Sequence, residues 1–187
     1  MDWCFRDGWA TSARRVPSPH YDKRPNEVLT LVVVHAISLP PGAFDVAAVD
    51  ALFLNQLDPN ADPYFAQILP LRVSAHFLID RVGALTQYVA CQDRAWHAGK
   101  SEWQGRPACN DYSIGIELLG SDDQVFTEAQ YQSLSDLLLS LFRTYPTLSR
   151  HTIVGHSDIA PGRKTDPGPC FQWEHLHRLL QEKGATT

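Results

Sequence analysis

The stretch LTLVVV, residues 29–34, is almost continuous in apolar and β-branched residues. Such a run predicts a strand buried on both faces, in the middle of a sheet. It places His35 at the carboxyl end of that strand. A second short strand is predicted over residues 152–156, and it too ends in a histidine, His156. Because ligands and catalytic groups gather at the carboxyl edge of α/β sheets, we expect the two histidines to meet there.

The remaining elements predict that helices cover this sheet. Residues 73–80 and 84–89 flank a turn at Gly83 and predict a hairpin, and residues 112–118 alternate like a strand with one apolar face. Helices are predicted over residues 45–56, from Thr127 to Pro146 behind a capping box, and over 171–183, whereas residues 92–110 read as a long loop. The predicted fold class is mixed α/β, a central mixed β-sheet flanked by α-helices.

Length and composition indicate one globular domain spanning residues 1–187. The chain has 44% hydrophobic and 20% charged residues, close to ordinary globular usage. Its formal net charge of -5, without a long run of like charges, argues against a nucleic-acid partner and favours a small or polar substrate. No window approaches the ~20 apolar residues of a membrane helix, so no membrane partner is expected. Without heptads or a long apolar edge, we expect a monomer.

The amino-terminal stretch MDWCFRD, residues 1–7, lacks the apolar segment of a secretory signal. If Met1 is the start of the protein, the expected location is the cytoplasm. The four cysteines contain no CxxC pair, and in a reducing compartment they are expected as free thiols. We therefore predict that each one is a small buried apolar residue.

Eight histidines are a rich supply of metal ligands for a chain of this length. Ten residues after His156 comes Asp166, in a loop bounded by Pro161 and Pro167. Together with His35, these residues would offer two imidazoles and a carboxylate, which leave the fourth position of a tetrahedral zinc ion open for water. On spacing alone, each histidine taken singly is more often a surface residue or a buried residue with satisfied hydrogen bonds than a metal ligand.

Three further side chains are candidates for chemistry. Glu117 shares a strand face with two very small residues, so it points either into solvent or into a cavity. Lys164, two residues before Asp166, could stabilise an oxyanion or be an exposed loop lysine. Trp96, next to His97, could wall a groove for a sugar or peptide, although a buried tryptophan without a ligand is as common. The other histidines stay unassigned: His20, His76, His151, His175 and His177.

Several motifs at matching separations resemble the zinc N-acetylmuramoyl-L-alanine amidases. They are VH at 34–35, SLPPG at 38–42, RAWHAG at 94–99, NDYSIGIE at 110–117, GHSDIAP at 155–161 and RKTDPG at 163–168. Within this family the chain is most similar to the AmpD type, which recycles anhydromuramyl peptides in the cytoplasm. The resemblance runs from about Gly8 to Trp173, and it implies the fold of the peptidoglycan recognition proteins.

The resemblance implies a role for each candidate. His35, His156 and Asp166 would ligate one zinc ion per chain, Glu117 would be the catalytic acid and base, and Lys164 would stabilise the transition state. The implied reaction is hydrolysis of the amide bond between the lactyl group of (1,6-anhydro-)N-acetylmuramic acid and the L-alanine of the stem peptide. The substrate would be a small muropeptide, and no organic cofactor is needed.

The resemblance also implies that Trp96 and Arg72 bind substrate. The chain departs from the family pattern at four positions, none of them a proposed ligand: Ala36, Lys100, Ala108 and Leu119. We expect these departures to affect substrate affinity and leave zinc binding intact.

Three alternatives remain open. A non-catalytic muropeptide-binding protein of the same fold would have lost a metal ligand, and a structural metal site would offer four protein ligands with several cysteines. A zinc hydrolase that acts on a different amide is the alternative that the sequence excludes least.

Overall fold

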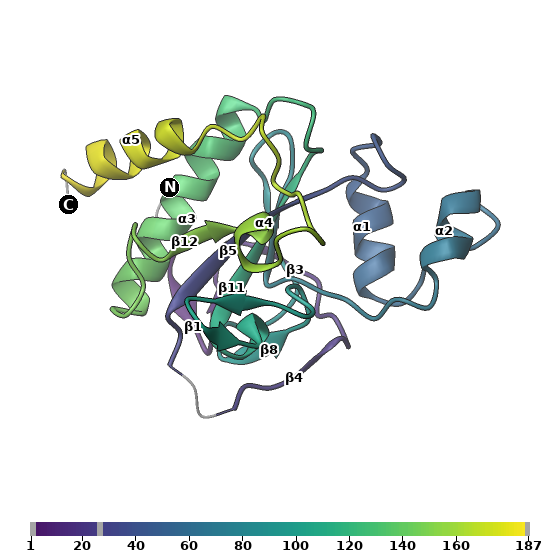
Figure 1. The fold of residues 1–187 in the computed structure, drawn as a ribbon, viewed down its shortest axis with the longest axis horizontal. Coiled ribbons are helices and arrows are strands. Elements are labelled where there is room, and N and C mark those ends of the chain that lie inside the picture. Colours follow the sequence, from purple (N-terminus) through teal and green to yellow (C-terminus); the bar gives the residue numbers. More distant parts are fainter. Residues whose placement is uncertain (1–2, 26–27, 186–187) are drawn as a thin grey trace.

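Six strands form the central sheet of the computed structural model, which describes residues 3–25 and 28–185 (Figure 1). In spatial order they are β12 (Ile153–Gly155), β5 (Leu31–Ile37), β11 (Ser113–Leu119), β6 (Phe77–Ile79), β7 (Leu85–Gln87) and β3 (Arg14–Arg15). The first four run parallel, β7 runs antiparallel to β6, and β3 runs parallel to β7. The predicted mixed sheet and the predicted hairpin are therefore confirmed.

Strands β5 and β11 pair in register along their whole length, from Leu31 opposite Ser113 to Ile37 opposite Leu119. The prediction ended the first strand before His35, but the strand continues through it to Ile37. Because His35 pairs with Glu117 of β11 and the pairing continues beyond it to Ile37, its position is more rigid than that of a residue in a loop. The predicted alternation of β11 is confirmed, and its apolar face lies in the core.

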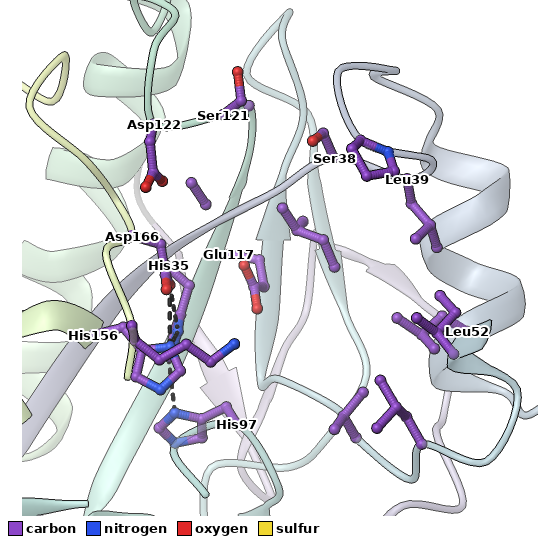
Figure 2. A pocket seen from close by; sticks show the side chains of 18 of the residues that line it. His35, Ser38, Leu39, Leu52, His97, Glu117, Ser121, Asp122, His156 and Asp166 are labelled. Carbon is purple, nitrogen blue, oxygen red and sulfur yellow. Dashed lines mark hydrogen bonds and ion pairs between the residues drawn. The ribbon is translucent and has the colours of Figure 1, made fainter. Parts of the chain in front are cut away.

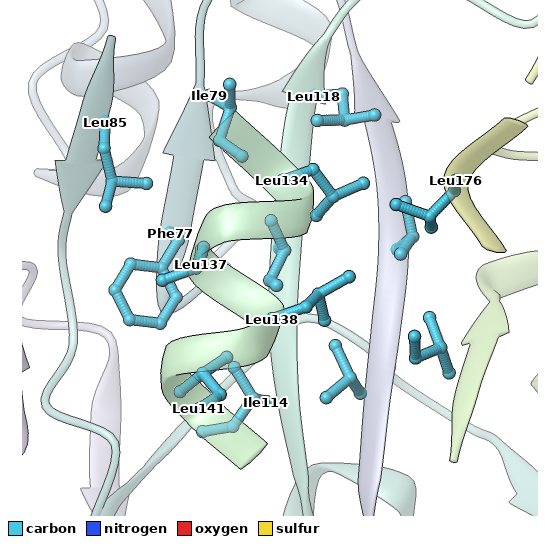
Figure 3. Close-up of a cluster of buried hydrophobic side chains, with 14 of the residues drawn as sticks. Phe77, Ile79, Leu85, Ile114, Leu118, Leu134, Leu137, Leu138, Leu141 and Leu176 are labelled. Carbon is cyan, nitrogen blue, oxygen red and sulfur yellow. The ribbon is translucent and has the colours of Figure 1, made fainter. Parts of the chain in front are cut away.

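Helices α3 (Glu128–Thr144) and α5 (Trp173–Gly184) cover one face of the sheet (Figure 1). The predicted capping box is present, because Thr127 and Gln130 bond to each other's backbone N–H groups. The apolar stripe of α3 packs on the strands and on α5, as Figure 3 shows. The centre of this core consists of Val32, Val34, Phe77, Ile79, Ile114, Ile116, Leu118, Leu134, Leu137, Leu138, Leu141 and Leu176.

The opposite face carries shorter elements and the candidate site. Helix α1 (Val46–Phe53), capped by Asp45, confirms the helix predicted over 45–56, although it ends earlier. Helix α2 (Pro63–Ile68) is not among the predicted helices. Its start is nonetheless typical, with Asp62 as N-cap and Pro63 as first residue. Apolar residues of α1 and α2 form a second core cluster with Leu78, Tyr88 and Leu119.

Short paired strands replace part of the predicted loop and of the amino-terminal segment. Strand β8 (Asp93–Ala95) pairs with β4 (Tyr21–Lys23), β9 (Glu102–Trp103) with β10 (Arg106–Pro107), and β1 (Phe5–Arg6) with β2 (Trp9–Ala10). A 3-10 helix, Cys109–Asp111, then leads into β11. These strands of two or three residues are too short to show an alternating pattern.

The prediction that all four cysteines are buried is half right. Cys91 and Cys109 are buried, whereas Cys4 is exposed and Cys170 is partly exposed. Met1, on which the expected location depended, lies outside the described residues. Within residues 3–25 and 28–185, no helix has the length and apolar character needed to cross a membrane.

Candidate active site

Three side chains converge at the carboxyl edge of the parallel strands. His35 Nδ1 lies 3.0 Å from His156 Nδ1 and 3.2 Å from Asp166 Oδ2, and His156 Nδ1 lies 3.1 Å from the same carboxylate oxygen. The two histidines are buried, and the Asp166 side chain is 14% exposed. The structure thus brings together the three residues that the sequence singled out.

The spacing of these three atoms fits a small metal ion. A tetrahedral zinc ion with bonds of about 2.0–2.1 Å to nitrogen and oxygen spaces its ligand atoms about 3.3 Å apart. The three observed separations, 3.0 to 3.2 Å, are close to that value. Two imidazoles and one carboxylate are also a donor set of catalytic zinc sites, which keep one position open. His35, His156 and Asp166 could therefore hold a metal ion.

The local structure explains how distant segments reach this point. His35 projects from β5, and His156 is the first residue of a short helix, α4 (His156–Ile159), directly after β12. The prediction placed His156 at the end of a strand and a loop after it, so the helical turn is new. Asp166 returns to the site because its carbonyl accepts a hydrogen bond of 3.0 Å from the backbone N–H of Ser157.

The electrostatics favour the protonation states that bind a metal. Burial lowers the pKa of His35 to about 4, although its hydrogen bond with Asp166 opposes this, so the imidazole is neutral near pH 7. Burial alone would raise the pKa of Asp166, but the hydrogen bonds with His156 and His35 outweigh it and lower that pKa below its usual range. Neutral imidazole and ionised carboxylate are the ligating forms.

His35, His156 and Asp166 are called the metal group below. Glu117 lies beside it, on the strand next to the one that carries His35. It is opposite His35 in the register of β11 and β5, about 4.8 Å away across the sheet, with its side chain on the same face. Its Oε2 is buried and has no hydrogen-bond partner among the residues that the structure describes. Burial, and then the charge of Asp166, raise the pKa of this carboxyl well above its usual value, while Lys164 opposes the shift. A raised pKa lets Glu117 hold a proton more readily than an ordinary glutamate, as a proton-transfer group requires.

A pocket of about 600 Å³ opens in front of these residues (Figure 2). Figure 2 shows Glu117 pointing into it, with the metal group on one side and Leu39 and Leu52 on the other. Trp96 and Lys164, two of the candidates from the sequence, also line it. The pocket joins a polar end, with Asp122, to an apolar end formed by α1 and α2.

The structure separates Arg72 from the other predicted site residues. Arg72 does not belong to the described residues that line the pocket, although its neighbours Leu71 and Val73 do. Its guanidinium group is exposed and donates hydrogen bonds to the carbonyls of Leu69 and Leu71. The Arg72 side chain is therefore exposed and outside the pocket lining.

The four departures from the family pattern have different surroundings. Ala36 lines the pocket beside His35, so it is placed to affect substrate binding. Leu119 is 1% exposed and belongs to the second core cluster. Lys100 and Ala108 are exposed and outside the pocket lining.

Two histidines that the sequence left undecided or unassigned lie against the site. His97 is buried, and its Nδ1 is 2.9 Å from His35 Nε2. His20 stacks on Trp96, with ring centroids 5.8 Å apart. No local sequence signal could have found these contacts, because each joins segments more than sixty residues apart.

Comparisons with known proteins agree with this geometry. The family profile of N-acetylmuramoyl-L-alanine amidase matches residues 24–169. The chain is 55% identical to the 1,6-anhydro-N-acetylmuramyl-L-alanine amidase AmpD of Escherichia coli, over 96% of this chain and 98% of that protein. A crystal structure of a selenomethionine AmpD derivative superposes with a TM-score of 0.92 at 54% identity, covering 95% of this chain and 99% of that one.

A more distant solved structure contains a bound muropeptide. It is the complex of the N-acetylmuramyl-L-alanine amidase AmiD of Escherichia coli with anhydro-N-acetylmuramic acid-L-Ala-D-gamma-Glu-L-Lys. Its TM-score is 0.62 at 29% identity, covering 91% of this chain and 60% of that one. From the family profile and the near full-length similarity to AmpD, the chain belongs to the N-acetylmuramoyl-L-alanine amidase family.

Proposed function

We propose that this chain is a zinc-dependent amidase that hydrolyses the bond between the lactyl group of (1,6-anhydro-)N-acetylmuramic acid and the L-alanine of a muropeptide. The observation that carries the proposal is the convergence of His35, His156 and Asp166 beside Glu117, whose buried Oε2 lacks a partner among the described residues. The names of the AmpD relatives and the substrate bound to AmiD support the choice of amide.

A bound zinc ion would supply the Lewis-acid chemistry of the reaction. Zinc, when bound, would polarise the amide carbonyl and lower the pKa of a water molecule toward ~7. His35, His156 and Asp166 would hold it, one ion per chain. The donor set supports zinc because it combines imidazole with a single carboxylate and leaves a coordination position open.

Glu117 would move the proton that the reaction has to transfer. It would take a proton from the attacking water as the carbon–oxygen bond forms, and return it to the alanine nitrogen as the carbon–nitrogen bond breaks. An amine is a poor leaving group unless it is protonated, so both transfers are needed. The raised pKa of Glu117 supports this double role, because a carboxyl that holds a proton more readily than usual can accept it from water and then donate it to the alanine nitrogen.

Lys164 would stabilise charge in the transition state, and residues in and near the pocket wall would bind the substrate. Lys164 would balance the negative charge on the tetrahedral oxygen, an effect of about 3 kcal/mol. Trp96, which lines the pocket, would offer an aromatic face to the substrate, and the exposed Arg72, between the lining residues Leu71 and Val73, would contact the stem peptide. The products would be the free peptide and the muramic acid carboxylate.

We further propose that the whole chain works as a single-domain monomer in the cytoplasm, on fragments of peptidoglycan that are being recycled. The near full-length similarity to AmpD supports the single domain and the recycling role. Cell fractionation tests the location, and sedimentation tests the oligomeric state. A membrane-bound or dimeric protein would contradict this part of the proposal.

Cleavage of a defined substrate tests the activity. Zinc-loaded protein is mixed with an anhydromuramyl tripeptide, and free peptide is followed by mass spectrometry, with Glu117→Ala as the comparison. We expect free peptide from the wild type and almost none from the variant. Intact substrate in the presence of bound zinc would favour a non-catalytic binding protein, and full activity of Glu117→Ala would remove the proposed acid and base.

A further inference from the structure

A buried histidine without a role in the proposed reaction lies directly behind the metal group. His97 follows β8, and its Nδ1 is 2.9 Å from His35 Nε2. The two rings meet edge to face, with centroids 5.0 Å apart and planes at 84°. In a hydrogen bond between two ring nitrogens, one carries the hydrogen and the other offers a lone pair. Which nitrogen carries the hydrogen decides whether Nδ1 of His35, the nitrogen that faces His156 and Asp166, has a lone pair available for a metal ion.

The direction of this hydrogen bond follows from the far end of the network. Ser113 Oγ is 2.5 Å from the carbonyl oxygen of Cys109, which can only accept, so the serine hydroxyl donates there. Ser113 Oγ then has only lone pairs for His97 Nε2, 3.2 Å away. His97 Nε2 is therefore the donor in that contact.

The same reasoning passes through His97 to His35. His97 is buried, and its ring partners are the uncharged Ser113 and His35, so its neutral form is favoured. A neutral imidazole carries one hydrogen, and this one is on Nε2, so Nδ1 of His97 accepts. The donor must be Nε2 of His35. His35 then has a bare lone pair on Nδ1, the nitrogen that lies 3.0 Å from His156 Nδ1.

We propose that His97 is a positioning residue for the metal centre, which accepts the Nε2 hydrogen of His35 and so keeps the Nδ1 lone pair of His35 directed at the metal position. This inference rests on the proposed function, because Nδ1 matters only if it ligates the ion. Partners of this kind set the orientation and tautomer of ligating histidines. What is unusual here is that a second histidine, held by a serine, does so.

The backbone next to His97 orients the other histidine ligand in the same way. His156 Nε2 lies 3.3 Å from the carbonyl oxygen of Ala98, which can only accept, so Nδ1 of His156 is also left bare. Asn110 Oδ1 accepts from the backbone N–H groups of both His97 and Ala98, at 3.1 and 2.8 Å. The dipeptide His97–Ala98, held by Asn110, thus determines which ring nitrogen carries the hydrogen on both His35 and His156.

The sheet is shaped to receive the His97 ring. A Cβ built on Gly115 would lie 2.4 Å from Cγ of His97, which no real side chain tolerates. The small residue on this strand face, expected from sequence to leave a cavity, therefore makes room for His97. The fit holds the ring within hydrogen-bond distance of His35.

The tautomer of His97 can be measured directly. In zinc-loaded wild-type protein with ¹⁵N-labelled histidine, two-bond ¹H–¹⁵N correlation spectra show which ring nitrogen carries the hydrogen. We expect His97 to carry it on Nε2, and His35 to carry its own on Nε2. A hydrogen on Nδ1 of His97, or on both of its nitrogens, would overturn the inference without any variant.

Zinc affinity, measured by competition with a chelator, tests the consequence. His97→Phe keeps a ring against Gly115 but has no acceptor, and we expect its affinity to fall about 10- to 100-fold. His97→Asn places an amide oxygen near the lost Nδ1, and we expect it to recover most of the affinity. His20→Phe is the matched control, since His20 is buried but does not contact the ligands, and its affinity should stay within about threefold.

The results separate this inference from the proposed function. Wild-type affinity in His97→Phe, or a loss that His97→Asn does not recover, would show that His97 only fills space. Absence of amide cleavage by the zinc-loaded wild type would instead overturn the proposed function, while the tautomer and the affinities would still be measurable. Cleavage together with the wrong tautomer would overturn this inference alone.

Discussion

Replacing Glu117 by methionine should remove activity and stabilise the fold at the same time. The carboxyl is partly buried beside the metal group, and its Oε2 has no hydrogen-bond partner among the described residues. Such a group lowers the stability of the folded state, because it loses its hydrogen bonds with water without gaining new ones. Methionine has a similar length, and its side chain has no charge to desolvate.

The burial of Glu117 and its proposed role set the expected changes in Tm and in kcat/KM. An unsatisfied buried polar group costs about 1–3 kcal/mol, and since Glu117 is partly exposed we take the lower part, about 1–2 kcal/mol. For a chain of this length, 1 kcal/mol corresponds to about 2–4 °C, so the Tm should rise by about 2–8 °C. Loss of general acid and base catalysis should lower kcat/KM by about 10²–10⁴.

Calorimetry of the metal-free proteins measures the stability, because bound zinc would add its own stabilisation. Peptide release followed by mass spectrometry measures kcat/KM in the zinc-loaded proteins. Glu102→Met is the matched control, since Glu102 is exposed, and its Tm should change by less than about 2 °C. A lower Tm for Glu117→Met would show that the carboxyl makes stabilising contacts, and a kcat/KM within tenfold of wild type would refute its catalytic role.

Four further predictions test other parts of the site. Asp166→Ala should lose stoichiometric zinc at sub-micromolar free metal, and full zinc content by atomic absorption would contradict the ligand assignment. Lys164→Met should lower kcat about 10²–10³-fold with little change in KM, whereas Lys164→Arg should recover part of it; equal effects of the two would refute a charge role. Ala36→Asn adds an amide to the pocket wall and should raise kcat/KM about 2- to 10-fold at unchanged zinc content, and an unchanged or lower value would sink that idea. Burial lowers the pKa of His76 to about 3, so its contribution to stability is complete above pH 6.5 and is lost as the pH falls toward 3. In His76→Asn, denaturant titrations should therefore show a slope of unfolding free energy against pH, between pH 4 and 6, that is smaller by about 1.4 kcal/mol per pH unit, and an identical slope would contradict the assignment.

Long periodic segments made most of the fold predictable. The β-branched run before His35 and the apolar stripe of α3 each have one structure that buries their side chains well. Helix α2 escaped prediction because it has only six residues, too few for a helical period, although Asp62 and Pro63 are an N-cap and a first residue of the usual kind. The two-residue strands depend on pairing partners far along the chain, which local sequence does not specify.

The candidate site divides in the same way. His35, His156, Asp166 and Glu117 could be selected because their positions at strand ends and on a strand face follow from local pattern, and the family resemblance gave each a role. The contact of His97 with His35 could not, since it arises from how a loop folds back over β11. The position of Arg72 likewise depends on the local path of the chain after α2.

Titration of the metal-free protein with zinc tests whether amide hydrolysis depends on one zinc ion bound by His35, His156 and Asp166. At each step, the release of peptide from an anhydromuramyl tripeptide is measured by mass spectrometry. We predict that the rate rises in proportion to added zinc and saturates at one ion per chain, in agreement with the one such group among the described residues, His35, His156 and Asp166. Cleavage by the metal-free protein, or no cleavage at full zinc occupancy, would contradict zinc-dependent hydrolysis at this site.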